Sequence, residues 1–189
     1  MAKVNWSAGA LVAPIPAVMV SCGNMEKSNI ITVAWCGITN TVPPKTYISL
    51  RPERYSYNII KESGEFVINL VPRNLTKIAD FCGMRTGRKI DKFAKCKLIK
   101  EKCKSLSAPM IAECPISIEC KVSDIIKLGS HDMFLADIVS VNVDESLLEG
   151  EKLCINRAHL CAFAHGEYYE LGKRIGKFGF SVKKKAPKK

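Results

Sequence analysis

The stretch Ile116-Ser-Ile-Glu-Cys-Lys-Val122 alternates apolar and polar residues without interruption. A period of two is typical of a β-strand with one buried face. Met133–Val143 alternates in the same way, with a phase slip at Ile138-Val139 that predicts a β-bulge. Between the two stretches, Leu128–Asp132 contains Gly129 and Ser130 and predicts a turn. The second half of the chain is therefore predicted to contain two long strands joined by that turn.

Further strands and two short helices are predicted from local patterns. A helix is expected after Pro52, ending at Gly64, and a second over Leu75–Phe81. Gly87–Lys104 is rich in lysine, and we expect most of it to be a solvated loop. These elements favour a mainly β fold with short helices, an antiparallel barrel of the α+β kind. The other predicted strands are Ala17–Cys22, Ile30–Trp35, Thr46–Leu50, Glu65–Val71, His159–Phe163 and Tyr168–Gly172.

Length and charge indicate one domain with a basic tail. The chain has 189 residues and a net charge of +11, of which five positive charges lie in the last seven residues, so the remainder carries 11 − 5 = +6. We predict a single domain over residues 1–180 and a flexible lysine-rich tail over 181–189. No run of about 18 apolar residues predicts a transmembrane helix.

The cysteines indicate a reducing compartment. Their number, nine, is odd, and no Cys-x-x-Cys pair occurs. We therefore expect structural thiols in a cytoplasmic protein, with one reactive thiol as the alternative. His131, His159 and His165 have no metal-ligand spacing, so no metal site is predicted.

The segment from Arg51 to Ser56 (Arg-Pro-Glu-Arg-Tyr-Ser) is a candidate anion site. It combines two guanidinium groups and a hydroxyl with the free backbone N–H groups of a predicted helix start, which suits a phosphate. The alternative is ordinary helix capping with solvated arginines.

The segment from Asn29 to Thr41 is a candidate wall for a flat heterocycle. It holds Thr32 and Trp35 within an irregular stretch whose backbone can bind the edge of a ring. The alternative is that Trp35 belongs to the core. His131, at a strand junction, and Lys92, in the basic segment, are possible companions. Dinucleotide and P-loop fingerprints are absent, and no hydrolase triad can be argued.

Together these motifs resemble the FMN-binding split-barrel family of flavin reductases, especially its flavoredoxin branch. The resemblance covers about residues 8–172 and depends on the order and spacing of several motifs. These are Asn29–Trp35, Pro43-Pro44, Tyr47–Leu50, Arg51–Tyr57, Gly64–Leu70, Asp91–Phe93, Gly129–His131 and Tyr169–Gly172.

The resemblance implies a homodimer of six-stranded Greek-key barrels that bind FMN near the subunit interface. By position, Arg51, Arg54 and Ser56 would hold the phosphate; Asn29, Thr32, Trp35 and Cys36 would line the isoalloxazine; and Lys92, His131 and Phe163 would lie near the flavin. Many relatives have Gly-Asp-His where this chain has Gly129-Ser130-His131, so direct use of NAD(P)H is open here.

The resulting functional hypothesis is an FMN-binding oxidoreductase that passes hydride or electrons from a reduced donor through bound FMN to a second acceptor. The donor stays open among NAD(P)H, a deazaflavin and an iron–sulfur protein. The alternatives are an NAD(P)H-dependent flavin or ferric reductase, a pyridoxamine-phosphate-oxidase-like or haem-handling barrel, and a flavin store. A non-catalytic nucleic-acid-binding module that uses the basic loop and tail is the alternative of another class.

Overall fold

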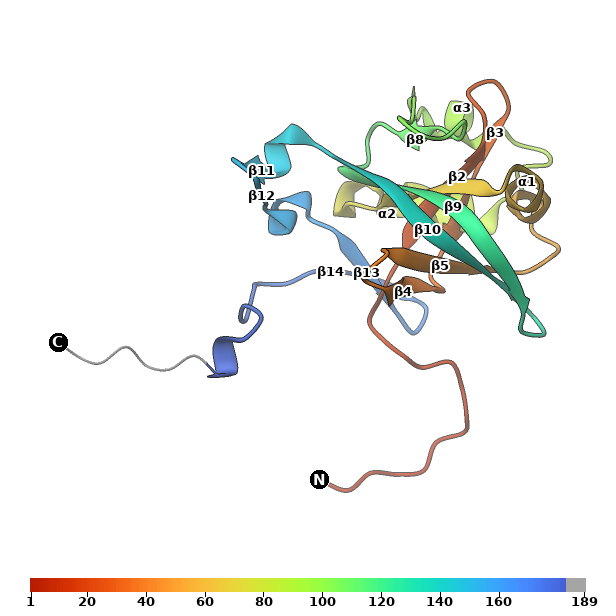
Figure 1. Ribbon diagram of the computed structural model, residues 1–189. Helices are drawn as coiled ribbons and strands as arrows, with labels where there is room; N and C mark the ends of the chain where they lie inside the picture. Colours follow the sequence, from red (N-terminus) through yellow and green to blue (C-terminus); the bar gives the residue numbers. More distant parts are fainter. Residues whose placement is uncertain (183–189) are drawn as a thin grey trace.

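Seven antiparallel strands form one curled sheet in the computed structural model of the protein, which describes residues 1–182 (Figure 1). Residues 183–189 of the expected lysine-rich tail lie outside the described residues. The strand order is β3 (Ser28–Val33), β2 (Val18–Gly23), β6 (Glu65–Leu70), β9 (Ile116–Lys127), β10 (Asp132–Val143), β5 (Lys45–Leu50) and β4 (Cys36–Asn40).

Short elements surround this sheet. In residues 1–182, no helix is long and apolar enough to span a membrane. The helices are α1 (Tyr55–Ser63), α2 (Thr76–Met84), α3 (Lys92–Cys96) and four 3₁₀ turns, Arg73–Leu75, Glu145–Leu147, Ile155–Ala158 and Phe180–Val182. The remaining strands are β1 (Ile15–Pro16), β7 (Lys100–Glu101), β8 (Met110–Ile111), β11 (Leu148–Glu149), β12 (Lys152–Leu153), β13 (Cys161–Ala164) and β14 (Glu167–Glu170).

The two longest strands confirm the alternating patterns in the sequence. β9 and β10 pair antiparallel along 12 residues each, and the turn between them contains Gly129. The register shifts between Ile138 and Ser140, where the phase slip predicted a bulge. A second shift, between Leu135 and Ala136, was not visible in the sequence.

The sheet curls until its two ends approach each other. The backbone N–H of Ser49 on β5 donates to the carbonyl of Trp35, 2.8 Å away, in the short link that follows β3. The enclosed space is filled by apolar side chains such as Val20, Ile48, Phe66 and Phe134. The expected mainly β barrel is therefore confirmed, but with seven strands in this sheet rather than six. The additional strand arises because residues 36–40 pair with β5, where an irregular extended segment was expected.

The β2–β3 hairpin is buried on both faces. On β2, Val18 and Val20 point into the barrel, whereas Met19 points into a second core beneath α2 and α3. Ile30 of β3 lies in that second core beside Phe93 of α3. Since both faces are covered, β2 reads as a continuous apolar run rather than an alternating one.

Helix α1 ends where the sequence predicted. Gly64 has φ +68°, the left-handed conformation that favours glycine, and its N–H donates to the carbonyl of Ile60 at 2.9 Å. The helix begins at Tyr55, three residues after Pro52, because residues 52–54 form a turn.

The prediction that most of Gly87–Lys104 is a solvated loop was wrong for its central part. Residues 92–96 form α3, capped by the Asp91 carboxylate, which accepts from the N–H of Ala94 at 3.1 Å. Lys92 and Phe93 are both 3% exposed. The composition was misleading because Phe93 and the whole Lys92 side chain, including its ammonium, point inward, whereas most of the other lysines of the segment are exposed.

A buried amide connects the sheet to the segment before β9. The Asn69 side chain donates to the Met19 carbonyl at 3.0 Å and to Ser21 Oγ at 2.9 Å. Its Oδ1 accepts from the N–H of Ile111 at 3.0 Å and from Ser117 Oγ at 2.8 Å. Asn69 is fully buried, so water cannot replace its amide as the hydrogen-bond partner of these groups.

The nine cysteines are all free thiols, and every one except Cys96 is buried. Burial raises the pKa of Cys36 and of Cys120 to about 12. Burial likewise raises the pKa of Cys22 to about 11, although hydrogen bonds from Ser56 and Asn29 oppose it. These values keep the thiols neutral and unreactive near pH 7, as expected for structural cysteines.

We expect Asn69→Ala to lower the free energy of unfolding by about 3 kcal/mol, because it leaves several buried polar groups without partners. Urea unfolding followed by circular dichroism measures this. Asn74→Ala, at an exposed position, is the matched control and should change stability by less than about 0.5 kcal/mol. Equal stability of both variants would show that the Asn69 bonds contribute nothing net.

We also expect one thiol, Cys96, to react rapidly with an aromatic disulfide reagent at pH 8 in the native protein. The other thiols should react only after unfolding, because burial blocks access of the reagent to them. The Cys96→Ser variant should lose the rapid phase. Rapid reaction of two or more thiols in that variant would contradict the structural assignment.

Candidate functional site

Three adjoining cavities form one cleft from the start of α1 to the β13–β14 hairpin. We call them the anion pocket, the ring cleft and the apolar pocket, with volumes of about 250, 160 and 280 Å³. The anion pocket and the ring cleft share Ile31 and Arg54, and the ring cleft and the apolar pocket share Trp35. The three cavities are therefore neighbours, and the first two lie along β3.

The anion pocket lies at the N-terminus of α1. No side chain caps this helix and its first turn contains no acidic residue, so the helix dipole leaves a partial positive charge at this end. The one acidic residue of the described chain that lines the pocket, Glu53, pairs with Arg51. Arg54, Arg85 and Lys92 line the same pocket. Among the described residues, none of these three cations forms an ion pair with a carboxylate. Such a set of donors attracts a phosphate.

Lys92 is the buried member of this set. Its ammonium donates to the carbonyl of Ile30 at 2.7 Å and to that of Cys82 at 2.6 Å. Burial lowers the pKa of Lys92; the nearby Cys82 opposes this and the nearby Arg54 adds to it. An ammonium has three N–H donors, so one remains after the two carbonyl bonds.

The floor of the anion pocket is a buried polar pair. Asn29 Nδ2 donates to Ser56 Oγ at 2.7 Å, and the two residues are 3% and 0% exposed. The bond ties β3 to the first turn of α1. Gly87 packs against this pair so closely that an added Cβ would lie 2.1 Å from Asn29 Oδ1. The loop that carries Gly87 therefore has no room for a side chain at this position.

The ring cleft carries Thr32, Trp35, Arg51 and His131 on its walls. Trp35 is 38% exposed, so it is a wall residue rather than a core residue. The Thr32 hydroxyl donates to the carbonyl of Ala79 on α2. The Arg51 guanidinium lies 3.8 Å from Glu53, and both side chains are more than half exposed.

A buried hydrogen bond holds His131 beside α1. The Tyr57 hydroxyl donates to Asp132 Oδ2 at 2.6 Å, and Tyr57 and Asp132 are 7% and 5% exposed. The same bond raises the pKa of Tyr57. His131 precedes Asp132, and its Nδ1 lies 2.9 Å from Ser130 Oγ. The start of β10 is therefore fixed to the helix that forms the anion pocket.

The cleft brings together nine of the ten residues singled out in the sequence. Cys36 lies apart, buried in the barrel core, with its thiol directed at the Pro16 carbonyl 4.0 Å away. The nine are Asn29, Arg54, Ser56 and Lys92 in the anion pocket, Thr32, Trp35, Arg51 and His131 in the ring cleft, and Phe163 with Trp35 in the apolar pocket.

Sequence reasoning missed part of the anion pocket. Arg85, Thr86 and Gly87 line it from the loop after α2. Two glycines, Gly83 and Gly87, enclose Arg85 and Thr86, and this spacing beside a predicted helix end was the available signal. In residues 1–182, no group of His, Cys, Asp and Glu side chains is arranged to hold a metal ion.

Comparisons with known proteins agree with this geometry. The family model for the flavin reductase like domain matches residues 12–172. The solved structure of flavoredoxin of Desulfovibrio vulgaris (Miyazaki F) is 33% identical and superposes with a TM-score of 0.90, covering 96% of this chain and 100% of that one.

Two curated relatives have activities in their names. The ferric-chelate reductase (NAD(P)H) of Archaeoglobus fulgidus is 29% identical over 133 residues, which are 66% of this chain and 76% of that protein. The FMN reductase (NADH) RutF of Acinetobacter baylyi is 23% identical over 124 residues, 66% of this chain and 63% of that protein. The chain therefore belongs to the flavin reductase-like family, and the expected class of flavin-dependent oxidoreductase is confirmed.

Proposed function

We propose that the flavin of this protein is FMN and that the chain is a flavoredoxin-like electron-transfer protein. The observation that carries the proposal is that a pocket lined by unpaired cations adjoins a cleft walled by an exposed tryptophan, with Ile31 and Arg54 lining both. A phosphorylated flavin has the same two parts, a dianion and a flat ring. The names of the relatives, flavoredoxin and FMN reductase, support the same choice.

Different residues of the chain would bind the phosphate from different sides. Arg54 would hold the phosphate from the open side of the anion pocket, Arg51 would approach it from the adjoining ring cleft, and the remaining N–H of Lys92 would reach it from the buried side. Ser56 accepts from Asn29, and its hydroxyl hydrogen, which otherwise faces the Cys22 thiol, would turn to a phosphate oxygen. These charge-assisted bonds act at the bare end of α1, where the helix dipole adds to them.

Thr32, Trp35 and His131 of the ring cleft would hold the ring, and Phe163 of the neighbouring apolar pocket would lie near it. The bound flavin supplies the electron and hydride transfer, and the protein orients it and tunes its potential. A positive group or N–H donor near the ring favours the reduced, more negative form. His131, which lines the ring cleft, is the candidate for this role, whereas Lys92 lines the anion pocket and is assigned to the phosphate.

For the electron donor and the electron acceptor, we make proposals from the names of the relatives. The flavoredoxin similarity favours exchange of electrons with a second redox protein. The names of the ferric-chelate and FMN reductases favour the alternative, an NAD(P)H-dependent flavin or ferric reductase. Visible spectra of FMN-loaded protein, recorded anaerobically after addition of NADH, NADPH, a deazaflavin or a reduced iron–sulfur protein, distinguish these donors.

We further propose a homodimer, a single domain over residues 1–180 and a cytoplasmic location. The eight buried free thiols support a reducing compartment. The edge strand β4 leaves Ile38 69% exposed, and it continues directly from Trp35 of the ring cleft. An unpaired apolar edge beside the flavin cleft suits a second copy of the chain.

We expect Arg54→Ala to weaken FMN binding to the apoprotein by about 1–3 kcal/mol, or roughly 5- to 150-fold in the dissociation constant, because it removes a charge-assisted bond. Isothermal titration calorimetry measures this. Arg157→Ala is the control, since that guanidinium pairs with Glu149 near β11 and β12, far from α1 (Figure 1).

Two results would remove the phosphate assignment. One is protein that stays colourless after desalting from excess FMN. The other is unchanged FMN affinity in both Arg54→Ala and Ser56→Ala.

We expect the full chain to sediment at twice its 20.9 kDa mass and Ile38→Lys to sediment as a monomer, because the lysine places a charge in the apolar contact. Analytical ultracentrifugation measures both. Met25→Lys, at the exposed tip of the β2–β3 hairpin, should leave the dimer intact. A monomeric wild-type protein would contradict the proposal.

A further inference from the structure

Two thiols of the second core meet at the ends of the loop that walls the anion pocket. Cys82, on the last turn of α2, is fully buried in that core. Cys96, the last residue of α3, is only partly buried and packs against the same core. A small reagent in solution can therefore reach Cys96, whereas Cys82 is shielded from it.

The Lys92 side chain shows that this side of α3 faces Cys82. Its ammonium donates to the Cys82 carbonyl at 2.6 Å. Residues four apart lie on the same side of a helix, so Cys96 is directed to the same place as Lys92. The pKa of Cys82 is raised to about 12, chiefly by burial and next by the neighbouring Cys96 thiol, to which Cys82 is hydrogen-bonded. Two thiols in contact need only a small shift to form a disulfide.

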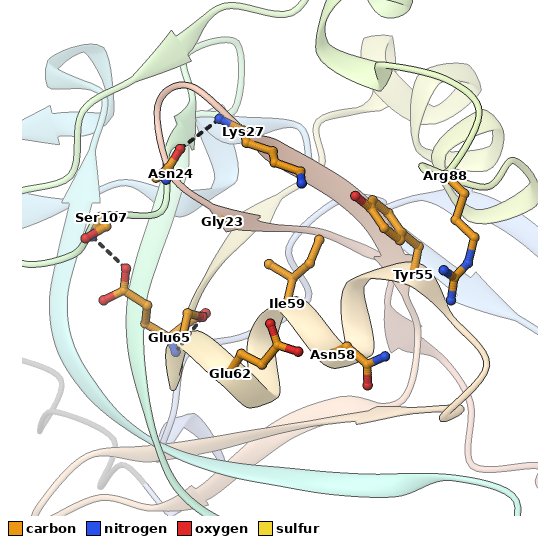
Figure 2. Close-up of a pocket in the computed structure, with 11 residues that line it drawn as sticks. Gly23, Asn24, Lys27, Tyr55, Asn58, Ile59, Glu62, Glu65, Arg88 and Ser107 are labelled. Carbon is orange, nitrogen blue, oxygen red and sulfur yellow. Dashed lines mark hydrogen bonds between the residues drawn. The ribbon is translucent and has the colours of Figure 1, made fainter.

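The segment between the two cysteines forms one wall of the anion pocket. Residues 85–87 line the pocket from this loop, and Lys92 lines it from α3. The next loop residue, Arg88, lines a groove on the other side of α1, where its guanidinium lies 5.4 Å from the centre of the Tyr55 ring (Figure 2). A disulfide between the two cysteines would enclose the whole loop and Lys92 in one covalent ring.

We propose that Cys82 and Cys96 form a reversible disulfide that closes this loop and strengthens the binding of phosphate in the anion pocket. The thiol pair is independent of the proposed function, whereas its effect on phosphate rests on the proposed flavin site. A loop that is fixed before the ligand arrives loses less conformational entropy on binding, so the oxidised protein should bind the phosphate more tightly.

Hydrogen peroxide is the oxidant that we assign to this reaction. Its O–O bond breaks, one oxygen joins the Cys96 sulfur as a sulfenic acid, and the other leaves as water. The Cys82 sulfur then attacks the Cys96 sulfur. The S–O bond breaks, and the hydroxyl leaves as a second water with the Cys82 proton. The two thiols lose two electrons and the peroxide gains them. Small-molecule thiols restore the pair by thiol–disulfide exchange and become a disulfide themselves.

The aromatic disulfide reagent tests the contact between the thiols in the reduced full chain. The reagent attacks Cys96, and the Cys82 sulfur then displaces the bound aromatic thiol, so the wild-type protein should release two aromatic thiols per chain from a single attack. Cys82→Ser should release one. The matched control is Cys114→Ser, which changes another buried thiol of the same core and should still release two.

A peptide map of the wild-type protein tests the disulfide without any variant. Arg85, Arg88 and Lys89 are exposed, so trypsin can cut the loop between the cysteines. After peroxide treatment and digestion without reductant, the peptides that contain Cys82 and Cys96 should stay joined. Their mass should be about 2 Da below the sum of the two thiol peptides, because two hydrogen atoms are lost. A reducing agent should separate them.

Isothermal titration calorimetry of the apoprotein with FMN tests the effect on the pocket. The oxidised wild-type protein should bind FMN about three- to tenfold more tightly than the reduced protein. Cys96→Ser cannot form the disulfide, and residue 96 does not line the anion pocket. This variant should therefore bind FMN with the affinity of the reduced wild-type protein after either treatment.

The outcomes separate this inference from the proposed function. Release of one aromatic thiol from the wild-type protein, or separate peptides after peroxide treatment, would overturn the thiol pair. Joined peptides with equal or weaker FMN binding would overturn the effect on the pocket. If neither form binds FMN, the proposed function and the effect on phosphate both fail, and joined peptides would still establish the disulfide.

Discussion

The buried ammonium of Lys92 is the constraint on which the site depends. It joins three elements, because it belongs to α3 and donates to carbonyls of β3 and α2 at 2.7 and 2.6 Å. Carbonyl dipoles solvate the charge but do not neutralise it, and in the described residues no carboxylate pairs with it. Burying an unpaired cation is costly. A bound phosphate would offset that cost, so the fold and the ligand stabilise each other.

The two-faced burial of β2 and β3 makes this arrangement possible. One face closes the barrel and the other supports α2 and α3, so the hairpin is held on both sides. The edge of β3 can then carry polar groups such as Asn29 and Thr32 in fixed positions. The exposed side chains of Arg51 and Arg54 lie at the solvent side.

Much of the fold was predictable from local patterns. The alternation in residues 116–122 and the phase slip near Ile138 are local sequence patterns. The structure has the strand and the register shift that they predicted. Gly64 likewise predicted the end of α1, because the left-handed conformation that ends many helices favours glycine. The anion site at Arg51–Ser56 followed from residue types alone, and the structure does place Arg54 and Ser56 at one pocket.

What the sequence could not show depends on tertiary contacts. A five-residue helix has almost no periodicity, so α3 was hidden in a lysine-rich run until Phe93 and Lys92 were seen to be buried. The groove beside α1 involves residues from the hairpin, the helix and the loop after α2, which only the fold brings together.

Cys36 is a residue for which the expectation was not met. The resemblance implied a wall residue, but Cys36 begins β4 with its side chain in the barrel core, whereas Trp35 lies in the bend before that strand and stays exposed. Which of the two neighbours can touch a flavin therefore depends on where the strand begins, and only the folded sheet shows that.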